Sequence, residues 1–149
     1  MTNWKACLTS LGLLWLRVLM GAGIAYHGYG KVFGGYMDRV VEGVAKMGFP
    51  FPELFAWAAA LSEFAGGILI VLGLATRFAA LCVFSTMSVA GFIVHAADPW
   101  NVKELAFAYW TMAGTLILTG AGPLSLDALF SKLRWWPHRK KVRDIPQEL

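Results

Sequence analysis

The stretch that most restricts the fold is residues 8–31, LTSLGLLWLRVLMGAGIAYHGYGK. Its length and apolar character predict a membrane-crossing helix, because about 20 apolar residues span the hydrocarbon core. The stretch nevertheless contains several cationic or titratable side chains. Residues three or four apart share a helix face, and one face carries Arg17, Gly21, Ile24, Gly28 and Lys31. Charged side chains of membrane helices normally face protein, so we expect this face to point inwards.

Composition supports the membrane class. Of the 149 residues, 58% are hydrophobic and only 15% are charged, whereas soluble domains are about half apolar and a quarter charged. The two cysteines, Cys7 and Cys82, have no CxxC or Cys/His spacing. This pattern supports neither a thiol relay nor a zinc site.

The rest of the chain predicts an all-α fold, a membrane four-helix bundle made by residues 1–130. The first run continues past Arg17, which favours a retained first span over a removed signal peptide. Residues 36–47 combine apolar residues at helical spacing with opposing charges, which predicts a short amphipathic surface helix between spans one and two. We expect a turn at residues 98–101. The predicted spans are about residues 8–28, 54–74, 78–96 and 105–120.

Loop charges predict the orientation of the bundle. Lys5, Arg77 and six cations of residues 131–149 lie on one side, and four cations mixed with carboxylates lie on the other. Positive residues are enriched in cytoplasmic loops, so we expect both termini in the cytoplasm. Residues 131–149 form a basic cytoplasmic tail that contains Trp135 and Trp136, which predicts contact with the bilayer and its anionic lipids rather than with nucleic acid.

Two mid-span charges suggest a buried contact. Arg17 and Glu63 lie near the middle of spans one and two, and antiparallel neighbours bring such residues to one depth. Ala59, Gly66 and Gly67 beside Glu63 allow close helix approach. We therefore predict a buried pair between Arg17 and Glu63, because the planar guanidinium suits a carboxylate. The pair either serves function or fixes helix register.

A second polar group is expected at the non-cytoplasmic end, where His27, Lys31, His95 and Glu104 should lie at similar depth. The faces that carry His95 and Glu104 would enclose a pocket, apolar below and polar at its mouth, beneath the surface helix. Such a shape suits an amphipathic ligand such as a quinone. Alternatively, His27, His95 and Lys31 are ordinary anchors at headgroup level. A haem is disfavoured because each histidine lies at a helix end and not inside the bundle. A metal site at His27, His95, Asp98 and Glu104 is disfavoured because these residues come from different loops and form no tight motif.

An ordered set of short motifs runs through residues 11–130: Arg17, Gly21, HGYGK at 27–31, GFP at 48–50, EFAGG at 63–67, LGLATR at 72–77 and GPLSLD at 122–127. This set resembles the DoxX family of small four-span membrane proteins. The matching positions are Arg17, His27, Gly28, Lys31, Glu63, Gly66, Gly67, Arg77 and Asp127. The resemblance implies a multi-pass protein of the prokaryotic inner membrane. The family is named after a subunit associated with a quinol oxidase, and relatives are linked to quinone-dependent oxidation of sulfur compounds and to oxidative-stress resistance. It assigns no catalytic residue, and the tail extends beyond the family's usual end.

The leading functional prediction is a quinone-associated subunit of a membrane oxidoreductase. The chain has no flavin motif, iron–sulfur ligand set or dinucleotide loop, so the redox centre is expected in a partner subunit or in the quinone itself. Whether the chain itself is an enzyme stays open. One alternative is a structural or assembly subunit of a membrane complex, and another is a small carrier in which Glu63 titrates. A partner protein or a homo-oligomer is expected in each case.

Overall fold

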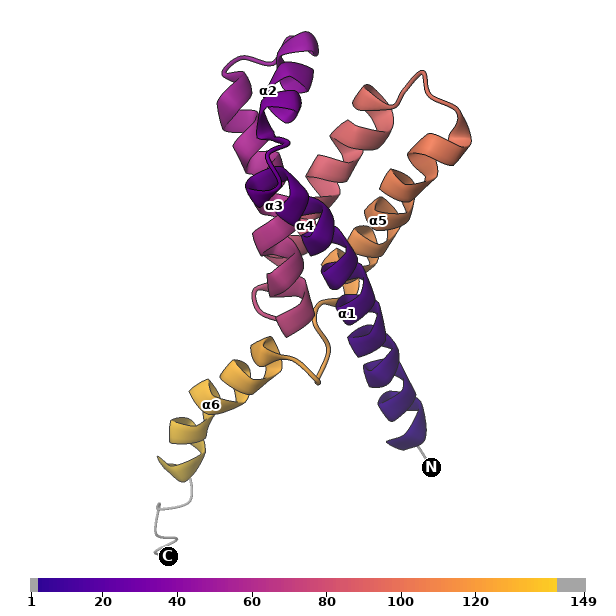
Figure 1. Cartoon of the computed structure of the whole chain (residues 1–149). Helices are drawn as coiled ribbons and strands as arrows, with labels where there is room; N and C mark the ends of the chain where they lie inside the picture. The colour runs from indigo at the N-terminus through magenta and orange to yellow at the C-terminus, as the bar shows by residue number, and fades with distance from the viewer. Residues whose placement is uncertain (1–2, 142–149) are drawn as a thin grey trace, which may run out of the picture.

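The computed structural model describes the backbone of residues 3–141 and the side chains of residues 4–133. All regular structure in this part of the chain is helical, which confirms the predicted fold class (Figure 1). Each expected helix is present, and the first is longer than expected at both ends. The elements are α1 (Asn3–Phe33), α2 (Met37–Lys46), α3 (Pro52–Leu72), α4 (Thr76–Val89), the π-helical segment η1 (Ala90–Val94), α5 (Trp100–Thr119) and α6 (Leu126–Lys141).

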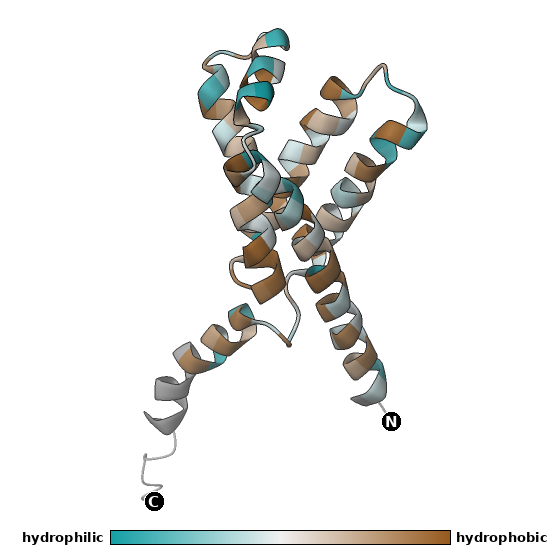
Figure 2. Cartoon of the chain, viewed as in Figure 1, coloured by the Kyte–Doolittle hydropathy of each residue, from teal (hydrophilic) through white to brown (hydrophobic). Residues whose placement is uncertain are grey.

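Within the part of the chain that the structure describes, three helices are long and apolar enough to cross a membrane: Trp4–Phe33, Pro52–Leu72 and Thr76–Val94. Large apolar side chains along them face outwards; Trp15, for example, is 69% exposed. Large exposed apolar surfaces mark contact with lipid or protein. The chain is therefore a multi-pass membrane protein. Hydrophilic residues gather in α2 and at the start of α5 (Figure 2). α5 packs beside α4 but is not among the three, so the fourth span and the orientation of the termini stay predictions.

Glycines set the distance between α1 and α3. A Cβ atom added to Gly21 would lie 2.7 Å from the carbonyl oxygen of Gly67, and one added to Gly67 would lie 2.7 Å from the amide nitrogen of Ala25. A Cβ on Gly28 would lie 2.7 Å from the Cα of Phe64. Side chains larger than hydrogen would hold the two backbones apart. The neighbouring Gly66 instead faces α4, so the two adjacent glycines of α3 serve opposite partners.

The turn between α3 and α4 is tight and depends on α6. α3 is followed by Gly73, whose positive φ of 68° permits a Schellman-type C-cap. In this cap the Leu74 amide donates a hydrogen bond to the Leu69 carbonyl. α4 then starts without a capping side chain of its own. Asp127 supplies the cap instead: its carboxylate accepts bonds from the amides of Ala75 (2.8 Å) and Thr76 (3.1 Å). The Asp127 amide also bonds the Gly73 carbonyl, so α6 is joined to the α3–α4 turn.

Substituting Asp127→Ala is expected to destabilise this end of the bundle by about 1–2 kcal/mol, the usual cost of a lost helix cap. The measurement is thermal unfolding of the purified protein in detergent. Glu53→Ala is the matched control, because Glu53 also lies at a helix start but is exposed and makes no capping bond. Equal melting temperatures for the two variants would contradict the capping role of Asp127.

The turn before α5 and the segment after α5 complete the described chain. The turn expected at residues 98–101 lies earlier, because Pro99 occupies the N-cap position of α5 and Trp100 already belongs to the helix. α6 begins at Leu126 and leaves the bundle at the end where α1 begins (Figure 1). Most side chains of the basic tail, including Trp135 and Trp136, lie outside the described residues, so the lipid contact of residues 131–149 stays a prediction.

Candidate functional site

A cavity of about 170 Å³ lies between α1, α3, α4 with η1, and α5, near the α2 end of the bundle. The structure brings four of the six predicted site residues to this cavity: His27, Lys31, Glu63 and His95. The remaining wall is mostly apolar and consists of Ile24, Met87, Ala90, Val102, Leu105, Ala106 and Tyr109. A small space with an apolar floor and several polar groups is typical of a ligand site.

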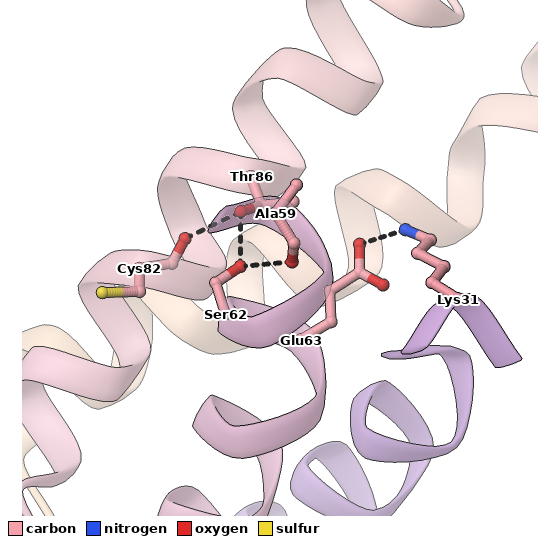
Figure 3. Close-up of polar contacts among 6 residues, drawn as sticks. All are labelled: Lys31, Ala59, Ser62, Glu63, Cys82 and Thr86. Carbon is pink, nitrogen blue, oxygen red and sulfur yellow. Dashed lines mark hydrogen bonds and ion pairs between the residues drawn. The ribbon is translucent and has the colours of Figure 1, made fainter. Parts of the chain in front are cut away.

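Glu63 is the most deeply buried carboxylate among the described residues, at 1% exposure. Its Oε1 atom accepts a bond from the Nζ atom of Lys31 at 2.5 Å, and Figure 3 shows the two side chains meeting between α1 and α3. Gly28 lies at the same level and brings the α1 backbone against Glu63 and Phe64. Lys31 can therefore reach Glu63 from one helical turn further along α1.

The predicted pair between Arg17 and Glu63 is wrong. The glycine contacts align Gly28 with Glu63, which places Arg17 opposite Gly73, at the far end of α3. Arg17 is fully buried there, and its Nη2 atom donates to the carbonyl oxygen of Leu124. Its inward orientation was predicted correctly, but its depth was not. Because α1 begins well before the level at which α3 ends, the midpoints of the two helices do not coincide.

Arg17 therefore belongs to a polar cluster at the α6 end, with Gly73, Leu124 and Asp127. A Cβ atom on Gly73 would collide with the Arg17 guanidinium, so the glycine provides the space for it. The Arg17 bond to Leu124 and the Asp127 cap both hold the segment before α6 to the bundle. The cluster therefore joins α6 to the bundle, and two buried nitrogens of Arg17, Nε and Nη1, have no hydrogen-bond partner among the described residues.

Glu104 also lies outside the cavity, and the face of α5 was assigned incorrectly. Glu104, Ala108, Thr111 and Thr115 are exposed, whereas the face with Ala106 and Tyr109 lines the cavity. The two threonine hydroxyls donate to carbonyls four residues earlier in the same helix. Hydroxyls satisfied in this way can face lipid. The predicted cover is also absent, since no residue of α2 lines the cavity.

Tyr109 is a site residue that was missed. Its hydroxyl lies against Gly23, where any larger side chain would collide with it. Its ring meets that of His27 edge to face, with centroids 5.9 Å apart, and the His27 side chain is exposed at the rim. The signal available in the sequence was the run of small and apolar residues on the same helix face, Val102, Ala106, Ala113 and Leu116.

His95 follows η1, and its side chain contacts Asp98, a residue that does not line the cavity. Its Nδ1 atom lies 2.8 Å from Oδ2 of Asp98, so one ring nitrogen is engaged. π-helical segments such as η1 often occur at functional sites. In the described part of the chain, no three metal-ligating side chains come together. The side chains at the cavity that can donate or accept hydrogen bonds are His27, Lys31, Glu63, His95 and Tyr109.

Comparison with known proteins places the chain in a family. The DoxX family model matches residues 12–96. The Escherichia coli protein "Inner membrane protein YqjF" is 31% identical over 133 residues, which cover 86% of this chain and 98% of that protein. "Inner membrane protein YphA", also from Escherichia coli, is 34% identical and covers 77% of this chain and 87% of its own length. The Bacillus subtilis protein named "Putative oxidoreductase CatD" is 31% identical, with 82% and 89% covered. No solved structure matches. Together with the apolar helices, these relatives identify a multi-pass inner-membrane protein, and the chain belongs to the DoxX family.

Proposed function

We propose that this chain is a quinone-associated subunit of a membrane oxidoreductase, and that the cavity binds the quinone head group. The observation that carries the proposal is the meeting of five polar or titratable side chains beside apolar ones, in a bundle whose helices are apolar enough to cross a membrane. A quinone presents the matching surfaces: a ring with hydrogen-bonding oxygens and an apolar tail. Such amphipathic ligands need an apolar pocket with a few placed polar groups.

The size of the cavity favours one ring. Its volume of about 170 Å³ is below the ~300–1,000 Å³ of pockets that enclose drug-sized ligands. One substituted ring would fill it, and the tail would then run outwards along the exposed apolar helix surfaces. The Nζ atom of Lys31 and the hydroxyl of Tyr109 are the donors for ring oxygens. His95, oriented by Asp98, keeps its second ring nitrogen for a ligand or a proton.

The oxidoreductase class is supported by the printed name of the Bacillus subtilis relative. The redox centre would lie in a partner subunit, and the process served would be oxidation of sulfur compounds or resistance to oxidative stress, as the family resemblance implies. We further propose that the chain crosses the membrane four times and has both termini in the cytoplasm. An even number of spans is supported by Figure 1, in which α1 begins and α6 leaves at the same end of the bundle.

The test is to purify the full chain in mild detergent and to measure bound quinone by solvent extraction and chromatography. Wild-type protein is expected to retain quinone, and His95→Ala and Tyr109→Phe are expected to retain several-fold less, because each removes a polar group from the cavity wall. Glu104→Gln is the matched control, since Glu104 is exposed and outside the cavity.

Wild-type protein that neither retains quinone nor binds it when added would overturn the proposal. An assembly subunit would give that result while its partners still co-purify. A carrier would instead give pH-dependent flux in proteoliposomes that Glu63→Gln abolishes. The three functional hypotheses therefore predict different experimental results.

A further inference from the structure

The second carboxylate oxygen of Glu63 has no protein partner. Oε1 is bonded to Lys31, whereas Oε2 is buried and has no hydrogen-bond partner among the described residues. Figure 3 shows the same arrangement, with a single dashed line reaching this carboxylate. A carboxylate can accept about four hydrogen bonds, and an unsatisfied buried oxygen is costly. Glu63 therefore needs a further donor.

An occupant of the cavity can supply that donor. Glu63 lines the cavity, and rotation about its last side-chain bond, which has a broad torsional preference, lets either oxygen face the space. Of the polar side chains around the cavity, Lys31 is bonded to Oε1, His95 is bonded to Asp98, and Tyr109 lies against Gly23. The fourth, His27, is exposed at the rim. Met87 and Ala106 offer no hydrogen-bond donor.

We propose that Glu63 accepts a hydrogen bond from a ligand hydroxyl, so that the cavity binds the hydroquinone form more tightly than the quinone. The inference rests on the proposed quinone site and adds the oxidation state of its preferred ligand. Lys31 and Tyr109 donate equally well to a carbonyl or to a hydroxyl oxygen, because both accept. Glu63 distinguishes the two forms because an ionised carboxylate only accepts hydrogen bonds, and a carbonyl would place a second acceptor against it.

The expected preference follows from the strength of a hydrogen bond to a charged acceptor. One such bond corresponds to roughly tenfold to a hundredfold in affinity. Replacing Glu63 with glutamine keeps the shape but supplies an amide donor that suits a carbonyl. The preference should then fall to about one or reverse.

The experiment titrates the full-length protein in detergent, under anaerobic conditions, with a short-chain hydroquinone and separately with its oxidised form. The ratio of the two dissociation constants is the readout. Wild type is expected to favour the hydroquinone by about tenfold or more, and Glu63→Gln is expected to lose this preference. Glu53→Gln removes an exposed carboxylate from the same helix and should keep it.

A ligand-side measurement covers the case in which Glu63→Gln does not fold. The dimethyl ether of the hydroquinone has no hydroxyl hydrogen, so the wild-type protein should bind it no better than the quinone. Equal wild-type affinities for hydroquinone and quinone, or a preference unchanged in Glu63→Gln, would overturn this inference and leave the quinone site standing. Binding of neither form would overturn the proposed function together with the inference.

Discussion

Substituting Gly28→Ala is expected to destabilise the protein by about 3 kcal/mol, which corresponds to roughly 10 °C in melting temperature for a chain of this size. The added methyl group would meet the backbone of Glu63 and Phe64, including the Phe64 Cα at 2.7 Å. Backbone atoms cannot rotate away as a side chain can, so α1 would have to move off α3. The movement would also draw Lys31 away from Glu63.

Gly12→Ala is the matched control in the same helix. Nothing lies within 4 Å of a Cβ atom at Gly12, and alanine favours helix over glycine by about 1 kcal/mol. This variant should melt at or slightly above the wild-type temperature. The measurement is thermal unfolding in one detergent, followed by tryptophan fluorescence. A Gly28→Ala protein as stable as Gly12→Ala would show that the α1–α3 contact is looser than the structure has it.

The helices and the inward face of α1 could be predicted from the sequence, because hydropathy and helical spacing depend on neighbouring residues alone. Of the five residues predicted to face inwards, Arg17, Gly21, Ile24 and Gly28 are buried, and Lys31 is half-buried. Span two was expected at about residues 54–74, within two residues of each end of the observed α3 (Pro52–Leu72).

Helix register could not be predicted by comparing midpoints. The pairing of Lys31 with Glu63 instead of Arg17 depends on which glycines of α1 and α3 meet, a contact between residues far apart in sequence. Matching the small residues Gly21 and Gly67 across the two helices would have given the observed alignment. The face of α5 was missed because polar residues were taken as inward, although the Thr111 hydroxyl is satisfied within its own helix.

Removing Lys31 alone is expected to cost about 3 kcal/mol, because Lys31→Met leaves the Glu63 carboxylate buried without a counter-charge. This value is at the low end for a buried pair, since the Lys31 side chain keeps 30% exposure whereas that of Glu63 keeps 2%. Lys46→Met is the control. It breaks an ion pair with Glu42 in which both side chains are largely exposed, and such pairs contribute little.

The double variant Lys31→Met with Glu63→Met separates the cost of an orphaned charge from the value of the pair. Replacing both partners of a buried pair by apolar residues is often neutral or stabilising, so the double variant should recover most of the stability lost in Lys31→Met. Full recovery of stability together with loss of quinone binding would mean that the pair of Lys31 and Glu63 serves ligand binding and not the stability of the fold. A double variant as unstable as Lys31→Met would instead mean that the pair holds α1 against α3, which is the role expected of an assembly subunit.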